Sequence, residues 1–101
     1  MTGSDETKPP AGALVRIFKI SNKKGLHARA SAKFVQAVER FDAVVKVTRG
    51  TETVGGNSIM GLMMLSAAPG TSITVEAKGK QAAEVLDAIS ALITRRFDEE
   101  D

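Results

Sequence analysis

The only histidine of the chain, His27, lies in a segment whose residue types suit the binding of an anion. Gly25 ends a polar loop just before it, and an apolar pattern at helical spacing begins just after it, so we expect His27 at the start of a helix. Backbone N–H groups there have no carbonyl partners, and the helix dipole favours negative charge. The same dipole disfavours the imidazolium, so we expect a neutral ring that can attack phosphorus, and a helix start that can hold the resulting dianion.

Arg29 stands in the first turn of this expected helix, and its guanidinium can bind a phosphate oxygen. Position alone leaves another interpretation open, in which His27 only caps the helix and Arg29 is a solvated charge. A hydrolase finds little support, because the chain has no cysteine and no second histidine, and His27 would have to be its only base. A metal site would lack ligands at suitable spacing. We therefore expect neither a metal nor another cofactor.

The pattern of apolar residues predicts the elements that position His27. Apolar or alternating segments indicate strands over residues 14–20, 43–49, 51–54 and 71–77. Helical spacing indicates helices over residues 28–40, from Ser58 to about Leu65, and after Gly79, where the apolar stripe reaches Phe97. Each strand has one apolar face. We therefore expect an α+β fold with the order βαββαβα, an open-faced sandwich in which three helices cover one face of a four-stranded antiparallel sheet.

The same patterns indicate which side chains form the core. The first strand has apolar residues on both faces, because Val15 and Ile17 alternate with Phe18 and Ile20. The residues expected to face inward are Phe18, Ile20, Phe34, Val35, Val38, Phe41, Val45, Val47, Leu62, Leu65, Ile73, Val75, Ala77, Val85, Leu86, Ile89, Leu92, Ile93 and Phe97.

The two ends of the chain differ in composition from the rest. Residues 1–13 are polar and contain Pro9, Pro10 and Gly12, which is typical of a disordered leader. Residues 98–101 form an acidic tail, and residues 14–97 are predicted to be one domain. The sequence shows no signal peptide and no apolar stretch that could span a bilayer, so we expect a cytoplasmic protein without membrane insertion.

The charge of the central domain indicates what it attracts. Residues 14–97 contain 13 Lys and Arg against 6 Asp and Glu, a net charge of +7. Such a surface attracts acidic proteins, phosphate groups or nucleic acid. The chain has no Tyr or Trp, and its four Phe follow the hydrophobic patterns, so base stacking has few candidates. We therefore expect no nucleic-acid partner, and keep a small basic RNA-binding domain as a less favoured alternative.

Two motifs together resemble one known family. GLHARASAKFV, at residues 25–35, is followed about thirty residues later by NSIMGLMML, at residues 57–65. The pair is similar to the histidine phosphocarrier HPr and its nitrogen-branch relative NPr, over roughly residues 14–97 and in the same element order. The resemblance implies that His27 is phosphorylated, with Nδ1 as the attacking atom and Arg29 as the phosphate partner. It implies a covalent relay rather than a turnover enzyme. The relay would receive its phosphoryl group from enzyme I and pass it to a IIA protein.

The two branches of this family both find support in the motifs. The FDA after the first helix, the LMML and the FDEED tail resemble NPr and suggest a IIA partner of nitrogen type, whereas SIMG resembles HPr proteins whose serine is a kinase target. One position departs from the family, which usually has proline where this chain has Ala30. Alanine is a strong helix former, so the helix should survive, although the loop before it could be looser. Lys24 stands where many relatives have a side-chain amide, and its cation could steady the phosphate.

A second site is expected around Ser58, which matches the regulatory serine of HPr proteins and would be modified by an HPr serine kinase/phosphorylase. Ser58 also suits the cap of the short helix, and both roles are compatible because a helix N-terminus tolerates a phosphoserine. Ile59, Met60 and Met63 follow on a helix too short to bury every side.

We interpret these three residues as a patch that docks partner proteins, with Lys33 as a charge at its rim; packing in the core and simple solvation are the respective alternatives. A second class of function also stays open, namely a regulator without phosphorylation that binds partners through Ile59, Met60 and Met63 alone. In either case we expect a monomer.

Overall fold

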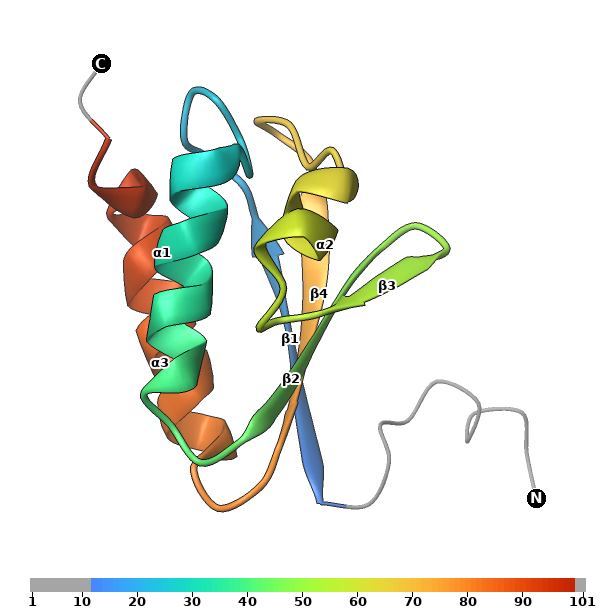
Figure 1. The fold of residues 1–101 in the computed structure, drawn as a ribbon, viewed down its shortest axis with the longest axis vertical. Helices are drawn as coiled ribbons and strands as arrows, with labels where there is room; N and C mark the ends of the chain where they lie inside the picture. Colours follow the sequence, from blue (N-terminus) through green and yellow to red (C-terminus); the bar gives the residue numbers. More distant parts are fainter. Residues whose placement is uncertain (1–11, 100–101) are drawn as a thin grey trace.

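The computed structural model describes residues 12–99, and most of the leader predicted over residues 1–13 and the end of the acidic tail lie outside this range. Figure 1 shows the order of the elements along the chain. They are β1 (Ala13–Lys19), α1 (Ala28–Glu39), β2 (Val44–Arg49), β3 (Glu52–Gly55), α2 (Ile59–Met64), β4 (Ser72–Lys78), α3 (Ala82–Thr94) and the short 3-10 helix η2 (Arg96–Asp98).

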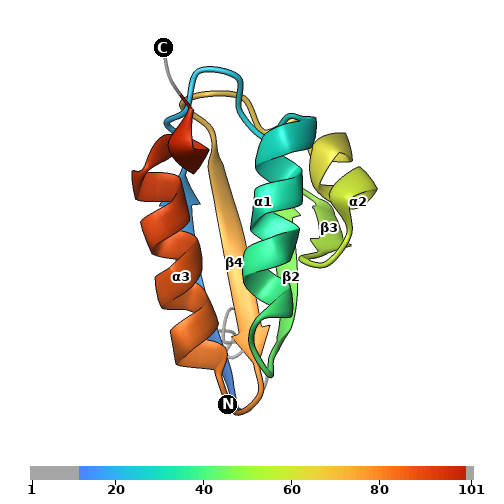
Figure 2. The ribbon, with the colours of Figure 1, turned by 60° about the vertical axis from the view of Figure 1, so that its left-hand side comes forward.

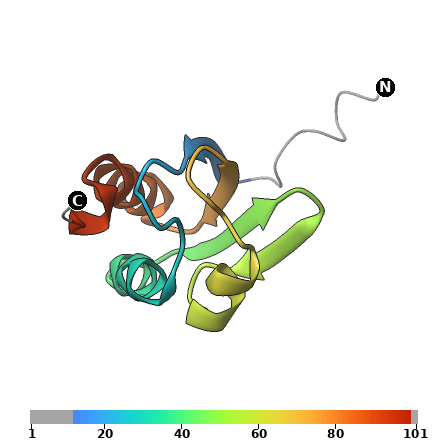
Figure 3. The same ribbon diagram turned by 90° about the horizontal axis from the view of Figure 1, so that it is seen from above.

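The four strands form one antiparallel sheet in the order β1-β4-β2-β3. β4 lies between β1 and β2, and its register places Ile73 opposite Phe18 and Val75 opposite Val47. The three α-helices lie on one face of the sheet, as the views in Figures 2 and 3 show. The predicted α+β fold is therefore confirmed. None of the helices within residues 12–99 is long and apolar enough to span a membrane.

The core lies between the sheet and the helices and follows the alternation of each strand. Val45 and Val47 in β2, and Ile73 and Val75 in β4, are fully or almost fully buried. Ile17 and its neighbour Val15 point to the open face instead, so the phase with Phe18 inward is the one adopted. A strand with one covered face needs apolar residues only at every second position, which is why the sequence pattern located this core well.

The C-terminal part of the chain differs from the prediction. α3 ends at Thr94, and Phe97 lies beyond it in η2 rather than on the helical stripe. Arg96, Phe97 and Asp98 all have positive φ, between 55° and 59°. This left-handed backbone is unfavourable for side chains other than glycine. Phe97 is nevertheless only 1% exposed, so the burial of its ring offsets part of that cost. The segment after α3 lies beside the start of α1 (Figure 1).

The loop between β1 and α1 is closed onto the segment that precedes β4. Ile20 N donates to Thr71 O at 2.8 Å, and Leu26 N donates to Ala67 O at 3.0 Å. Gly25 makes the second contact possible: its φ is +64°, and a Cβ there would lie 2.2 Å from Ala67 O. A glycine is therefore required two residues before His27, the N-cap residue of α1.

This requirement can be separated into its two causes by comparing Gly25→Ala with Gly50→Ala. Gly50 has a similar φ of +62°, but a Cβ there meets nothing within 4 Å. Gly50→Ala should lose about 1 kcal/mol of unfolding free energy, from backbone strain alone, and Gly25→Ala about 2–4 kcal/mol, because the clash with Ala67 is added. Urea unfolding followed by circular dichroism measures both. Equal losses in the two variants would contradict the packing described for this loop.

Candidate functional site

His27 is the N-cap residue of α1, as predicted from its position in the sequence. Its backbone is extended, with φ −76° and ψ −177°, and its Nδ1 accepts a hydrogen bond from Arg29 N at 3.2 Å. Its side chain is 28% exposed, so the ring lies at the surface and not in the interior. The amides of the first helical turn lie beside it, and such amides lack partners within the helix. α1 begins at Ala28 although Ala30 replaces the proline usual in the family, which confirms that the helix forms without it.

The other ring nitrogen of His27 contacts Glu99, which the sequence had indicated only as part of the acidic tail. Nε2 of His27 is in direct contact with Oε2 of Glu99. The same oxygen accepts a hydrogen bond from Asn22 Nδ2 at 2.9 Å, and Glu99 retains only 13% exposure of its side chain. Asn22 is fully buried and also donates to Gly25 O at 2.8 Å. The site is therefore built from the β1–α1 loop, the start of α1 and the segment after α3.

Glu99 is an anion at neutral pH. Burial by itself raises its pKa, but the hydrogen bonds from His27 and Asn22, together with the electrostatic effect of His27 and Lys24, outweigh burial and hold the pKa of Glu99 below its ordinary value. An ionised carboxylate can only accept hydrogen bonds. In both hydrogen bonds at Glu99 Oε2, the partner nitrogen must therefore be the donor.

The segment that carries Glu99 is anchored beside α1. Lys33 Nζ donates to Phe97 O at 2.9 Å and lies 3.5 Å from Asp98 Oδ2, while Arg95 Nε pairs with Asp98 at 3.0 Å. The hydrogen bond from Arg95 and the charges of Arg95 and Lys33 lower the pKa of Asp98, against the opposing effect of burial. The burial of Phe97 and these two cations hold η2 in place.

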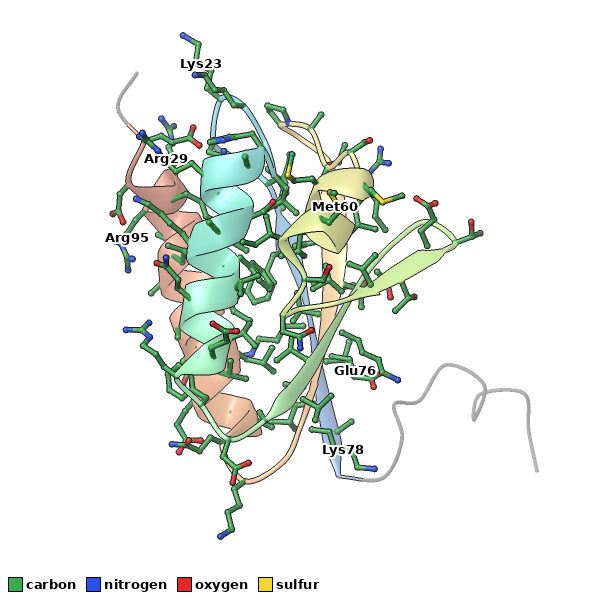
Figure 4. All side chains as sticks on the ribbon, in the orientation of Figure 1. Lys23, Arg29, Met60, Glu76, Lys78 and Arg95 are labelled. Carbon is green, nitrogen blue, oxygen red and sulfur yellow. The ribbon has the colours of Figure 1, made fainter. Side chains whose placement is uncertain are left out.

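Lys33 therefore lies apart from the patch to which the sequence interpretation had joined it. It lines the groove between α1 and α3, together with Arg95 and Asp98. Figure 4 shows Arg29 and Arg95 on one side of α1 and Met60 on the other. The structure thus brings Lys33 together with the C-terminal segment rather than with Met60.

A surface hollow opens beside the ring of His27. It is lined by Lys23, Lys24, His27, Ala28, Arg29, Asp98 and Glu99. Figure 4 shows Lys23 and Arg29 at the same end of the molecule. The two acidic residues are paired with His27, Arg95 and Lys33, whereas Lys23, Lys24 and Arg29 add positive charge. Backbone amides and surplus cations around a neutral imidazole can bind a phosphate dianion. No three His, Asp or Glu side chains within residues 12–99 are grouped to hold a metal ion.

Ser58 caps α2 as predicted, because its Oγ accepts from Gly61 N at 2.9 Å. Leu62 and Leu65 are buried, as expected. The side chains that remain outside form an apolar surface, here called the methionine patch. Its members are Ile59, Met60, Met63 and Met64, which are exposed by 41%, 70%, 39% and 69%. Met64 had not been assigned to this surface from the sequence, although a six-residue helix leaves it little room inside.

Comparison with known proteins gives a consistent result. Residues 14–95 match the family described as PTS HPr component phosphorylation site. The chain is 49% identical over 86 residues to phosphocarrier protein HPr of Neisseria meningitidis, covering 85% of this chain and 97% of that protein. It is 42% identical over 86 residues to phosphocarrier protein NPr of Shewanella violacea, covering 85% and 94%. The crystal structure of an HPr from Thermoanaerobacter tengcongensis superposes with a TM-score of 0.82 at 35% identity, covering 87% of this chain and 99% of that one.

The anchoring of the C-terminal segment can be tested with Phe97→Ala. Because the Phe97 ring is fully buried, its removal should lower the unfolding free energy by about 3–4 kcal/mol. Phe41→Ala is the matched control, since Phe41 is only partly buried at the edge of the core and should cost clearly less. Chemical unfolding measures both losses. A loss for Phe97→Ala no larger than that for Phe41→Ala would show that η2 does not anchor this segment.

Proposed function

The chain belongs to the HPr family of phosphocarrier proteins of the phosphotransferase system, and we propose that His27 is the residue that carries the phosphoryl group. This family relays a phosphoryl group through a phosphohistidine, and the chain has one histidine. The observation that carries the proposal is the position of Nδ1, 3.2 Å from Arg29 N at the start of α1. A nitrogen lone pair is held there among amides that favour an anion.

The transfer step follows from this geometry. The lone pair of Nδ1 attacks the phosphorus of a phosphorylated donor protein. A bond forms between Nδ1 and phosphorus, and the bond between phosphorus and the donor atom breaks, its electron pair leaving with the donor. The backbone amide of Arg29 donates to Nδ1 before the transfer, and it can then donate to a phosphoryl oxygen instead. The Arg29 guanidinium and Lys24 supply positive charge from the same hollow.

The partners we propose are enzyme I as donor and a IIA protein as acceptor, both in the cytoplasm. The methionine patch supports docking, because α2 packs beside α1 and presents exposed apolar side chains next to the helix that carries His27. Flexible thioether side chains can adapt to two different partners in turn. Lys33 and Arg29, the two cations of α1, favour partners with acidic surfaces.

Ser58 is proposed as a regulatory phosphorylation site for an HPr serine kinase/phosphorylase. Its hydroxyl caps α2, so a phosphate there would meet the favourable end of the helix and would not unfold it. It would place about −2 charge next to Met60, on the surface proposed to dock acidic partners. Serine phosphorylation would therefore weaken docking rather than alter the ring of His27.

The carrier role is tested by incubating the protein with phosphoenolpyruvate and its cognate enzyme I. The wild-type chain should gain one acid-labile phosphate, and His27→Ala should gain none. Arg29→Ala should still be labelled, but more slowly by about tenfold or more, because one preorganised donor to the phosphoryl group is lost. Label that persists in His27→Ala would refute the assignment. A wild-type chain that binds enzyme I without taking up phosphate would favour the purely binding regulator.

The docking role of the methionine patch is tested with Met60→Glu. A negative charge there should raise the KM for phosphoryl transfer from enzyme I by about tenfold while leaving kcat nearly unchanged, because it weakens binding and not chemistry. Ile17→Glu provides the matched control, since Ile17 is exposed by 71%, as Met60 is by 70%, but lies on the open face of the sheet. If both variants raise KM equally, the patch is not the docking surface.

A further inference from the structure

The two ring nitrogens of His27 have contacts of opposite kinds. Nδ1 lies 3.2 Å from Arg29 N, and a backbone N–H can only donate, so Nδ1 bears no proton. Nε2 contacts the ionised carboxylate of Glu99, which can only accept, so Nε2 bears the proton. Both contacts select the same tautomer of the neutral ring, with the lone pair on the nitrogen that faces the helix start.

We propose that Glu99 is a positioning residue for phosphoryl transfer, which holds His27 in the tautomer protonated at Nε2 and offsets the positive charge of the phosphorylated ring. The inference rests on the proposed function of His27. Glu99 lies outside residues 14–95, the segment that matches the family model, and belongs to the segment after α3.

The position of Glu99 is fixed by groups that have little freedom. Asn22 is fully buried, and its Nδ2 donates both to Gly25 O at 2.8 Å and to Glu99 Oε2 at 2.9 Å. The reverse orientation of this amide would turn its oxygen towards two acceptors, so the orientation observed is the favourable one. On the other side, Phe97 is buried two residues before Glu99 and its carbonyl oxygen is held by Lys33. The carboxylate of Glu99 is therefore held against the ring of His27 from two sides.

The proton on Nε2 simplifies the chemistry of the relay. When Nδ1 attacks phosphorus, the ring already carries its only proton on the other nitrogen, so no base has to remove one. The product is an imidazolium with phosphorus on Nδ1 and hydrogen on Nε2. The side chain of Glu99 is only 13% exposed, and its carboxylate lies against that hydrogen. The carboxylate therefore favours the cation. When the phosphoryl group leaves for the acceptor, the ring returns to the same neutral tautomer.

Glu99 can act in this way without competing for the place of the phosphoryl group. It contacts the nitrogen that is not attacked, while Nδ1 faces the amide of Arg29. A carboxylate that orients an imidazole through its distal nitrogen is a recurrent arrangement in catalytic triads and around metal-bound histidines. The structure assigns that arrangement to two residues 72 positions apart in this chain.

The tautomer can be measured without any transfer partner. Because the chain has one histidine, its ring 15N resonances report directly which nitrogen is protonated at a pH at which the ring is neutral. The wild-type protein should show a proton on Nε2 only. Glu99→Ala should show a mixture of both tautomers, whereas Glu99→Gln, whose amide oxygen still accepts a hydrogen bond, should largely keep the wild-type form. Glu84→Gln, in the first turn of α3 at the opposite end of that helix, is the matched control and should change nothing.

The rate of phosphoryl uptake from enzyme I tests the effect of the charge. Glu99→Ala should lower the single-turnover rate by about tenfold or more, and Glu99→Gln, which keeps the tautomer but not the charge, by a smaller factor. Wild-type tautomer and rate in Glu99→Ala would overturn the inference, while loss of label in His27→Ala would leave the proposed function standing. Absence of any label on the wild-type chain would instead overturn the proposed function and this inference with it.

Discussion

The capping of α1 by the ring of His27 is the interaction on which the rest of the structure depends. A helix start leaves amides without partners, and the side chain that accepts from them is usually an oxygen of Ser, Thr, Asp or Asn. Here the acceptor is Nδ1, which receives the hydrogen bond of Arg29 N. The lone pair that stabilises the helix is the same one that would bond to phosphorus. The structural role and the proposed chemical role therefore share one atom.

The surrounding structure serves to hold that ring from both sides. The loop before it is closed by the contact between Leu26 and Ala67, which requires the left-handed glycine at position 25. The segment after α3 supplies Glu99 and reaches the ring only because Phe97 is buried in a backbone conformation that is otherwise unfavourable. Local strain near a functional group is thus balanced by burial a short distance away.

Much of this arrangement could be predicted from the sequence, for physical reasons that also explain what was missed. Alternation in β2 and β4 reports which side of a strand is covered, so Val45, Val47 and Ile73 were assigned correctly. The start of α1 and the cap at Ser58 follow from local signals. The contact between His27 and Glu99 has no such signal, because it depends on a turn of three left-handed residues without glycine and on a partner distant in the chain. Acidic residues near a terminus are typical of solvated tails, and only the fold shows that one of them is not.

The separation between the two halves of the site has a consequence for how the protein is made. Synthesis proceeds from the N-terminus, so His27 leaves the ribosome 72 residues before Glu99. The sheet is also incomplete until β4 inserts between β1 and β2, because it supplies both of their pairings. A nascent chain therefore exposes the histidine long before its ring is oriented. The ring gains its partner at Nε2 only when translation has delivered the segment after α3, so fragments from interrupted synthesis contain the histidine without the carboxylate that orients it.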